Sequence, residues 1–505
     1  MFVNTLRLST LLCSAALAIT LAACSDNSRD RDAGGDTLLP VSDPVVSLPP
    51  DVGNINLLAL NIDLNEVGYQ QSEFFLEGSA SAFRNTSELG EDGFWSAEPA
   101  ETAEYRVRIV VYRPIDPANF DGNVLIEWLN VTAGFETPPS WGTGHLEMRR
   151  GGSAWVGVSA QFIGIEGSES SLLPLHLKAA NPERYGSLLH PGDSFSFDIY
   201  QQVAQAIRSP QGIDPLEGLV AENLIAYGES QSAGRLTTYI NAIHPLYQIF
   251  DGFMVHSRGD SGAPLAQEPL TSIPTPDVAL IRTDVNVPVL QFKTETDVLL
   301  LGHARARQPD TDLIRTWEVT GTAHGDLYTF VTGRNDDIGA PEFASVREEN
   351  TVLGFITCGL PINNGPHHYV FNTAVHALNE WISDGILPPT SPRLTLNDDE
   401  SDYRYDALGN VLGGIRTPYV DAPSAILLGN ENPGDRFCFL FGTTSLFDAA
   451  QMASLYIDEA GYVAAVTEAT NAAVESGFLL QADADAIIAW APEQWREQVN
   501  SDPGI

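Results

Sequence analysis

The chain has 505 residues, of which 43% are hydrophobic and 18% are charged, and this composition is typical of a globular protein with a large core. Acidic residues number 66 and basic residues 26, so the formal net charge is −40. Such a charge repels nucleic acid and anionic lipid, so the composition argues against binding to either through a basic patch.

The N-terminus predicts export and a lipid anchor. Arg7 precedes a short apolar run, which is too short to span a membrane but fits a secretory signal over 1–23. The run ends in Leu21-Ala-Ala-Cys24, which is similar to a bacterial lipobox, where cleavage before the cysteine leaves its thiol to carry lipid. Because Ser25 follows Cys24, the usual sorting rule favours the outer membrane of the cell envelope. The alternative is an ordinary signal peptide with a chance cysteine.

Two regions follow the predicted signal. Residues 24–50 are rich in Asp, Gly and Pro and have little to pack, so they are predicted to be a flexible tether between the lipid and the domain. Residues 51–505 contain no internal repeat and no sharp break in composition. We therefore predict one domain over 51–505, with a C-terminal extension.

The domain begins with strands that alternate with helices. Residues 104–113 largely alternate apolar and polar side chains, which is a strand pattern. The apolar segments 124–130 and 154–160 are predicted strands, and the segment 141–150 between them is compatible with a helix. Such a β-α-β unit with apolar strands indicates a parallel sheet that is buried on both faces.

The same alternation continues along the chain. The predicted elements are helix 197–207, strand 224–227 with a helix after it, strands 252–256, 287–292 and 315–319, helix 369–381, and two helix-like stretches after residue 447. This order predicts an open α/β sheet, mostly parallel and flanked by helices. The segment between residues 256 and 287 is too long for a plain connection, so we interpret it as a lid-like insertion or pocket wall.

A serine stands at the sharp turn predicted after the strand 224–227. The sequence there is Gly228-Glu-Ser230-Gln-Ser232-Ala-Gly234, in which small residues allow a strand and a helix to approach closely. Two serines fit this motif, but an elbow serine follows its strand almost immediately, so we assign Ser230 as the nucleophile rather than Ser232. The alternative role for Ser230 is to cap the helix.

A nucleophilic serine needs a histidine base and a carboxylate that orients the histidine. In the α/β-hydrolase arrangement the acid and then the histidine follow the serine, each on a loop after a strand. Glu295 and Asp297 follow the strand 287–292, and His324 follows the strand 315–319. We assign His324 as the base, and we favour Asp297 over Glu295 as the acid because Asp297 stands at the usual place after its strand.

Backbone N–H groups are predicted to form an oxyanion hole. The N–H of Gln231, directly after the nucleophile, is one candidate donor. The second is expected from the loop after the strand 124–130, where Asn130 or Val131 fits by position alone. Structural roles in that turn are equally compatible with both residues.

No motif predicts a metal or a nucleotide cofactor. His367 and His368 lack a third ligand at suitable spacing, and the acidic loop 398–402 lacks the glycine and the terminal glutamate of an EF-hand. The glycine-rich signatures of dinucleotide and phosphate binding are also missing from the sequence. We therefore expect the protein to work without a cofactor or metal.

Cys358 and Cys438 are the cysteines that remain once the signal and Cys24 are set apart. In an exported protein they fit a disulfide, although two buried free thiols fit the sequence equally well. We predict that they are joined.

Several motifs together resemble the bacterial family described as alpha/beta hydrolase domain proteins, which is related to serine esterases. The resemblance runs from about Gly68 to the C-terminal region, and it implies an α/β-hydrolase fold. It also implies that Ser230 is the nucleophile and His324 the base, with the acid between Glu295 and Asp297. The motifs are Gly-Glu-Ser230-Gln-Ser-Ala-Gly, Ile-Glu-Trp-Leu-Asn-Val-Thr-Ala-Gly134, Trp-Val-Gly-Val-Ser-Ala-Gln161, Gln-Phe-Lys-Thr-Glu-Thr-Asp297, Gly-Thr-Ala-His324 and Gly-Asn-Val-Leu-Gly-Gly-Ile-Arg-Thr-Pro418.

The sequence therefore predicts a lipid-anchored serine hydrolase that acts on carboxylic esters through an acyl-enzyme. Ser230 would attack the carbonyl, His324 would transfer the proton and Asp297 would orient the imidazole. An amidase or a lactonase would use the same groups, and the ester could be small or polymeric. The alternative from another class is a surface-binding lipoprotein without catalytic activity on a hydrolase scaffold. We expect contact with a membrane only through the lipid at Cys24, and no nucleic-acid partner.

Overall fold

A computed structural model of the protein describes residues 38–500, apart from 170, 172, 353, 355 and 435. The predicted signal over 1–23, Cys24 and the first part of the predicted tether lie outside the described residues. Among the residues that are described, no helix has both the length and the apolar character needed to cross a membrane.

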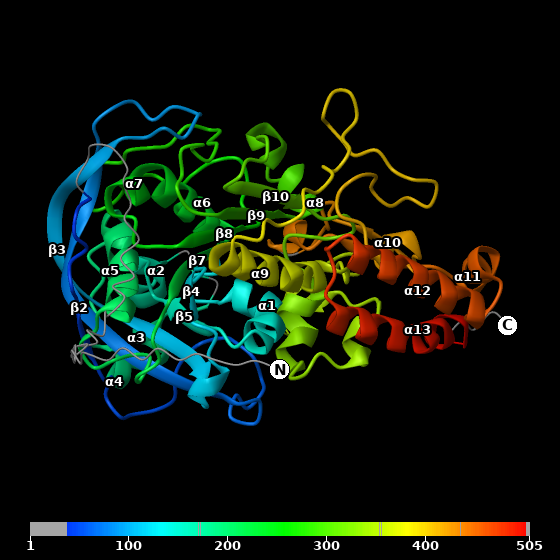
Figure 1. Ribbon diagram of the computed structural model, residues 1–505, viewed down its shortest axis with the longest axis horizontal. Coiled ribbons are helices and arrows are strands. Elements are labelled where there is room, and N and C mark those ends of the chain that lie inside the picture. Colours follow the sequence, from blue (N-terminus) through cyan, green and yellow to red (C-terminus); the bar gives the residue numbers. More distant parts are fainter. Residues whose placement is uncertain are drawn as a thin grey trace, which may run out of the picture. The chain divides into compact units, whose positions relative to one another are not determined.

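Ten strands form one sheet within the described residues (Figure 1). They are β1 (Val45–Ser47), β2 (Tyr69–Asn85), β3 (Ala97–Pro114), β4 (Asn123–Trp128), β5 (Ala154–Val158), β6 (Gln211–Gly212), β7 (Asn223–Glu229), β8 (Gly252–His256), β9 (Val289–Lys293) and β10 (Ile314–Glu318). Their order across the sheet is β10-β9-β8-β7-β4-β5-β3-β2-β1-β6. The strands from β10 to β5 are parallel, β5, β3, β2 and β1 pair in antiparallel fashion, and β6 is parallel to β1.

The mostly parallel sheet predicted from the sequence is confirmed. Every residue of β4, β5, β8, β9 and β10 is buried, because helices cover both faces of this part of the sheet. The long strand β2 has no counterpart in the prediction. Its exposed positions are Gln71, Glu77, Ser79, Arg84 and Asn85, and polar residues interrupt its apolar ones, so its sequence lacks the continuous apolar run that marked the central strands.

The predicted tether does not extend to residue 50. Val45 and Val46 lie in β1, which pairs with β2 on one side and β6 on the other. The Val46 side chain is buried in the apolar cluster under the sheet. A short segment flanked by prolines can therefore form an added strand when one of its valines is buried. The composition of the segment gave no indication of this strand.

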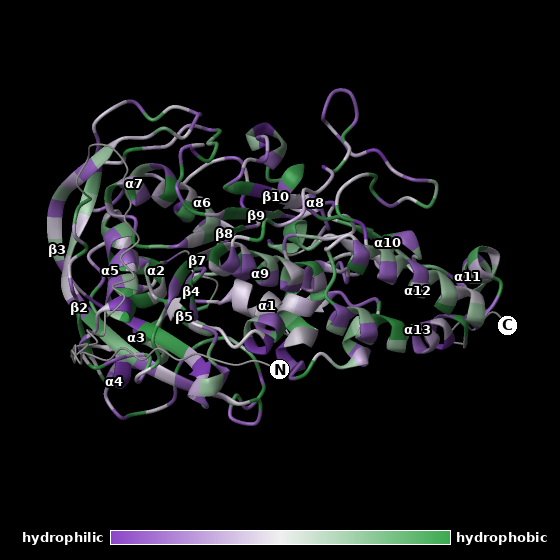
Figure 2. Cartoon of the chain, in the orientation of Figure 1, coloured by the Kyte–Doolittle hydropathy of each residue, from purple (hydrophilic) through white to green (hydrophobic). Residues whose placement is uncertain are grey.

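Helices cover the two faces of the sheet (Figures 1 and 2). On one face α5 (Ser196–Arg208) and α6 (Gln231–Thr238) bury apolar residues in a large cluster with β2, β4 and β7. On the other face α1 (Pro139–Arg150) and α9 (His367–Asp384) pack against each other and the sheet. The shorter helices are α2 (Phe162–Glu166), α3 (Leu177–Ala180), α4 (Pro182–Tyr185), α7 (His244–Tyr247), α8 (Glu295–Val298) and α10 (Pro418–Asp421).

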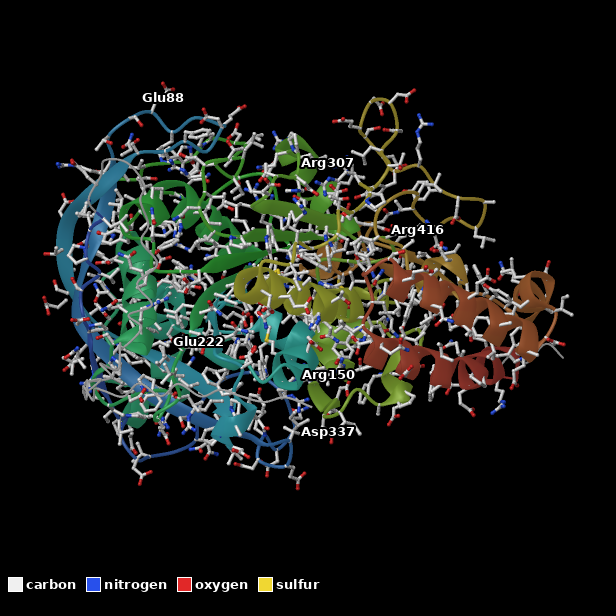
Figure 3. The ribbon with its side chains drawn as sticks, in the orientation of Figure 1. Glu88, Arg150, Glu222, Arg307, Asp337 and Arg416 are labelled. Atoms are coloured by element: carbon white, nitrogen blue, oxygen red, sulfur yellow. A yellow bond between two sulfur atoms is a disulfide. The ribbon has the colours of Figure 1, made fainter. Side chains whose placement is uncertain are left out.

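The C-terminal extension contains three helices, where the sequence predicted two. They are α11 (Ala449–Tyr456), α12 (Glu459–Glu475) and α13 (Gln481–Asn500), and they share an apolar cluster with α10 and the hairpin of β13 (Ala425–Leu428) and β14 (Thr443–Leu446). Arg150 at the end of α1, labelled in Figure 3, pairs with the buried carboxylate of Asp483 at 2.5 Å. This ion pair ties the extension to the helix layer of the sheet.

The segment between β8 and β9 does not have the predicted role of a pocket wall. Its backbone at Ala263 accepts from Thr238 and donates to Gly234, so it packs along α6. Leu265 and Ile281 are buried against the main apolar cluster. The segment therefore supports the helix after Ser230 from outside, and it contributes no residue to the cavity beside that serine.

Cys358 and Cys438 form a disulfide, which confirms the predicted pairing. The bond lies in a small apolar cluster that includes Leu327, Ile362 and Phe441. It joins the hairpin of β11 (Thr351–Val352) and β12 (Ile356–Thr357) to the turn at residues 437–441.

We predict that the denatured, unreduced domain, expressed without Cys24, contains no titratable thiol. Because the disulfide joins residues 80 positions apart, its removal lowers the free energy of unfolding by at most about 4 to 5 kcal/mol on the chain-entropy account. Denaturant unfolding of Cys358→Ser/Cys438→Ser measures this loss. Two reactive thiols in the wild-type domain would show that the bond does not form.

Candidate active site

Ser230 occupies a strained turn between β7 and α6. Its backbone has φ 56° and ψ −118°, its N–H donates to the carbonyl of His256 at 2.9 Å, and its hydroxyl makes no helix-capping bond. An added Cβ at Gly228 would lie 2.8 Å from the carbonyl oxygen of Ser232, so glycine is required for this close approach. Ser232 itself is fully buried. The turn therefore presents Ser230, rather than Ser232, at the carboxyl edge of the sheet.

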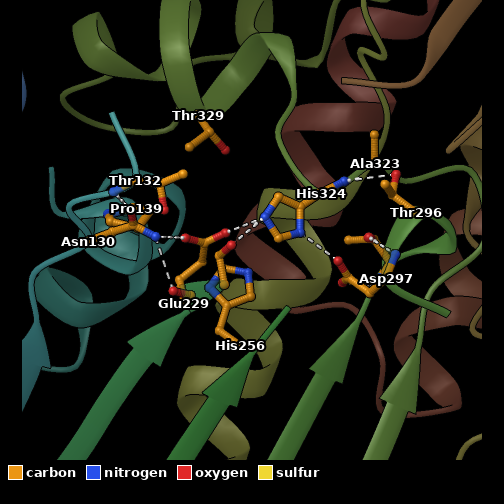
Figure 4. A network of polar contacts seen from close by, with 12 residues as sticks. Asn130, Thr132, Pro139, Glu229, His256, Thr296, Asp297, Ala323, His324 and Thr329 are labelled. Atoms are coloured by element: carbon orange, nitrogen blue, oxygen red, sulfur yellow. Dashed lines mark hydrogen bonds and ion pairs between the residues drawn. The ribbon is translucent and has the colours of Figure 1, made fainter. Parts of the chain in front are cut away.

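His324 lies between the Ser230 hydroxyl and the Asp297 carboxylate, and Figure 4 shows its contact with Asp297. Its Nε2 is 2.8 Å from Ser230 Oγ, and its Nδ1 is 2.6 Å from Asp297 Oδ1. The second carboxylate oxygen of Asp297 accepts the Thr294 N–H at 2.8 Å, which closes a capping box at the start of α8. The structure thus brings together three residues that lie far apart in the sequence.

Burial disfavours the charged forms of Asp297 and His324, but the attraction between the carboxylate and the imidazolium outweighs this effect. Burial alone would raise the pKa of Asp297, yet the neighbouring imidazole holds this pKa below its usual range. Burial likewise would lower the pKa of His324, but the carboxylates of Glu229 and Asp297 raise it above its usual value. Asp297 is thus an ionised partner that favours the Nδ1–H tautomer, leaving Nε2 free to accept a proton from Ser230.

Glu295, the alternative acid, faces away from His324. Its two carboxylate oxygens accept the backbone N–H groups of Gly321 at 2.6 Å and Gly429 at 2.7 Å. Burial raises its pKa to about 8. Glu295 therefore links the loop that carries His324 to the end of β13, and of the two candidate acids Asp297 is the one that contacts the imidazole.

A second carboxylate, which the sequence reasoning missed, approaches His324 from the opposite side (Figure 4). Glu229 Oε1 lies 3.2 Å from His324 Nε2, and Glu229 Oε2 accepts from the side-chain amide of Asn130 at 3.0 Å. Burial raises the pKa of Glu229 to about 7. The sequence did hold a signal for this contact, because Glu229 directly precedes the elbow serine. The last residue of a buried strand lies at the same edge of the sheet as the residue after it.

Asn130 does not supply the predicted backbone donor, because its N–H donates to the carbonyl of Thr137 at 2.9 Å. Its side chain instead accepts the Thr132 N–H and holds Glu229. Gln231 is the first residue of α6, where backbone N–H groups lack helical acceptors. Of the two residues considered after β4, Val131 is the one whose N–H makes no hydrogen bond in the described part of the chain.

The other histidines singled out in the sequence have structural contacts. His367 Nε2 lies 2.9 Å from His256 Nε2, and its Nδ1 lies 3.1 Å from the carbonyl of Ala323, next to His324. The His368 ring stacks on Tyr328 with centroids 3.5 Å apart. Within the described ranges, no group of three or more His, Cys, Asp or Glu side chains is arranged to hold a metal ion.

Ser230 and His324 border a cavity of about 710 Å³, a volume that includes its mouth. Its walls are formed by the loop after β4, the segment 325–330 after His324, the β11–β12 hairpin, and the turn at residues 437–441, which the disulfide joins to that hairpin. The lining residues are Asn130, Thr132, Ala133, Phe135, Thr137, Pro139, Glu229, Ser230, His324, Gly325, Phe330, Val352, Ile356, Phe437, Leu440 and Phe441.

Comparison with known proteins gives one family match. The model of the family described as alpha/beta hydrolase domain matches residues 41–489. No curated protein matches the chain.

Solved structures of other hydrolases align with parts of the chain. An α/β serine hydrolase without a lid from Xanthomonas campestris is 13% identical, with 43% of this chain and 72% of that chain covered and a TM-score of 0.22. A fungal esterase from Rhizomucor miehei is 11% identical, with 61% and 86% covered and a TM-score of 0.29. A glucuronoyl esterase from Solibacter usitatus is 10% identical, with 56% and 82% covered and a TM-score of 0.27.

Asp297 and Glu295 are expected to differ in their effect on turnover. Asp297→Asn removes the ionised partner of His324 and should lower kcat about ten-thousand-fold while leaving the fold intact. Glu295→Gln loses one backbone hydrogen bond, which should lower stability by about 1 to 3 kcal/mol but kcat by less than about tenfold. Ester hydrolysis and thermal unfolding measure the two effects. A larger loss of kcat in Glu295→Gln would reverse the assignment.

Glu229 is expected to set the pH dependence. If Ser230 is the nucleophile, only neutral His324 can accept its proton, so we expect the rate to rise with pH through the pKa of His324, which Glu229 raises. Glu229→Gln should therefore move the acid limb of kcat/KM to lower pH. Glu88→Gln removes an exposed charge in the loop between β2 and β3 (Figure 3), and because Glu88 does not line the cavity, this variant serves as the control. An unchanged midpoint in Glu229→Gln would show that this carboxylate does not act on the imidazole.

Proposed function

This chain belongs to the alpha/beta hydrolase domain family, and we propose that it is a serine hydrolase that cleaves carboxylic esters through an acyl-enzyme. The observation that carries the proposal is the continuous hydrogen-bond chain from Ser230 Oγ through His324 to Asp297, placed on a strained elbow beside a cavity. Nucleophile, base and orienting acid are the three groups that acyl transfer through a serine requires.

In the first half of the proposed reaction, Ser230 Oγ attacks the ester carbonyl and its proton passes to His324 Nε2. The Nδ1–H of the resulting imidazolium donates to Asp297, which lies 2.6 Å away. The carbonyl oxygen becomes an oxyanion, for which the N–H of Gln231 and that of Val131 are the proposed donors. His324 then returns its proton to the alkoxy group, the carbon–oxygen bond breaks, and the alcohol leaves.

In the second half, a water molecule takes the place of the alcohol. His324 accepts a proton from this water as it attacks the acyl carbonyl, and the tetrahedral intermediate collapses when Ser230 Oγ leaves and regains the proton. Glu229 would act in both halves, because its carboxylate lies 3.2 Å from the nitrogen that carries the transferred proton. A negative charge there stabilises the imidazolium that forms in each transition state.

The decisive comparison is between the two serines of the elbow. Ser230→Ala should abolish labelling by a fluorophosphonate probe and lower hydrolysis of 4-nitrophenyl acetate by about a million-fold. Ser232→Ala should retain substantial activity, because Ser232 is fully buried and serves the turn through its small size. A chelator should leave the wild-type rate unchanged, since no step uses a metal.

Folding of both variants is checked by circular dichroism. Undiminished hydrolysis by Ser230→Ala, or a loss confined to Ser232→Ala, would contradict the proposed nucleophile.

A further inference from the structure

The cavity beside Ser230 is apolar apart from the reacting groups and a few hydroxyl and amide groups near them. Aromatic and aliphatic side chains supply most of the rest of the lining, among them Phe330, Val352, Ile356, Phe437 and Phe441. An apolar group of a ligand gains free energy when it leaves water for such a lining. The lining therefore favours a substrate with an apolar group next to its ester carbonyl.

Two of these rings lie directly against the residue after His324. A Cβ added at Gly325 would lie 2.5 Å from the Phe330 ring and 3.1 Å from the Phe441 ring. The two rings are 5.5 Å apart between their centroids. Because Gly325 directly follows the proposed base, an apolar group seated against these rings would lie close to the reacting carbonyl.

The same wall is fixed by covalent and apolar contacts. Val352, Ile356 and Phe441 belong to one buried cluster with the Cys358–Cys438 disulfide. The disulfide joins the two segments that supply these residues, so the wall is held in place before a substrate arrives. A preformed wall loses little side-chain freedom when it binds an apolar group.

Charge restricts the substrate further. Among the lining residues there is neither Lys nor Arg, and the lining carboxylate is that of Glu229. A carboxylate on the substrate would have to leave water, meet no cation in the lining and lie near the negative charge of Glu229. Such a group is disfavoured both by desolvation and by like-charge repulsion.

We propose that this site selects uncharged esters that carry an apolar aliphatic or aromatic group, and that it rejects esters with a carboxylate in place of that group. The inference rests on the proposed serine-hydrolase function and adds the substrate class to it. Either the acyl half or the alcohol half can carry the apolar group, so both halves are varied in the test.

The test measures kcat/KM by proton release at pH 8. Ethyl 5-methylhexanoate is compared with ethyl acetate in the acyl half, and benzyl acetate with methyl acetate in the alcohol half. Monoethyl glutarate is the charged counterpart of ethyl 5-methylhexanoate, since a carboxylate replaces a branched alkyl group of similar size. We expect at least one apolar ester to be preferred by about 100-fold or more over its small counterpart, and the glutarate to react at least about 100-fold more slowly than the 5-methylhexanoate.

Substitutions in the cavity wall and on the nearby surface show whether the wall determines the preference for apolar esters. Phe441→Ala and Phe437→Ala should each lower the ratio of kcat/KM for the apolar ester to kcat/KM for the small ester by about tenfold. Phe439→Ala is the matched control, because Phe439 lies in the same turn but is 36% exposed and does not line the cavity. Thermal unfolding shows which variants are folded. One folded wall variant, either Phe441→Ala or Phe437→Ala, is enough for the test.

The outcomes distinguish this inference from the proposed function. Hydrolysis of the small esters without a preference, or a preference for the glutarate, would overturn the substrate class and leave the serine mechanism intact. Labelling of Ser230 by a fluorophosphonate without hydrolysis of any of the five esters would do the same. No hydrolysis and no labelling would overturn the proposed function and the substrate class together.

Discussion

The backbone of Ser230 is the constraint on which the site depends. A non-glycine residue at φ 56° and ψ −118° lies outside the common conformations and costs about 1 to 3 kcal/mol. The bond from its N–H to the His256 carbonyl and the close approach of Gly228 to the carbonyl oxygen of Ser232 hold this conformation. Because the strand ends and the helix begins at this one residue, its hydroxyl is presented at the edge where the loops after β4, β9 and β10 also lie.

Two carboxylates bracket one imidazole at this edge. Asp297 contacts Nδ1 of His324, whereas Glu229 approaches Nε2, the nitrogen that also faces Ser230. Glu229 and Ser230 are consecutive, so the elbow itself brings the second carboxylate to the base. Asn130 then holds Glu229 through its side-chain amide. This contact keeps the loop after β4 beside the nucleophile.

Sequence reasoning located the residues whose positions follow from the order of strand, turn and functional group. Ser230, Asp297 and His324 each come shortly after an apolar strand, and parallel strands bring those ends to one edge. It failed in two places: the Asn130 N–H is taken by Thr137 within the same loop, and the cavity wall comes from the disulfide-linked hairpin instead of the segment after β8. Neither contact leaves a periodic pattern in the sequence. The strand at Val45–Ser47 was hidden because its Pro-flanked sequence has the composition of a linker.

The formation of an acyl group on Ser230 is the central claim, and it can be observed directly. The wild-type protein is mixed with excess 4-nitrophenyl ester, quenched in acid within the first turnover, digested, and the elbow peptide is fragmented in a mass spectrometer. We expect one added acyl group, located on Ser230, and no acyl group in Asp297→Asn quenched at the same time. An acyl group on Ser232, or turnover of the ester without any acylated peptide, would contradict it.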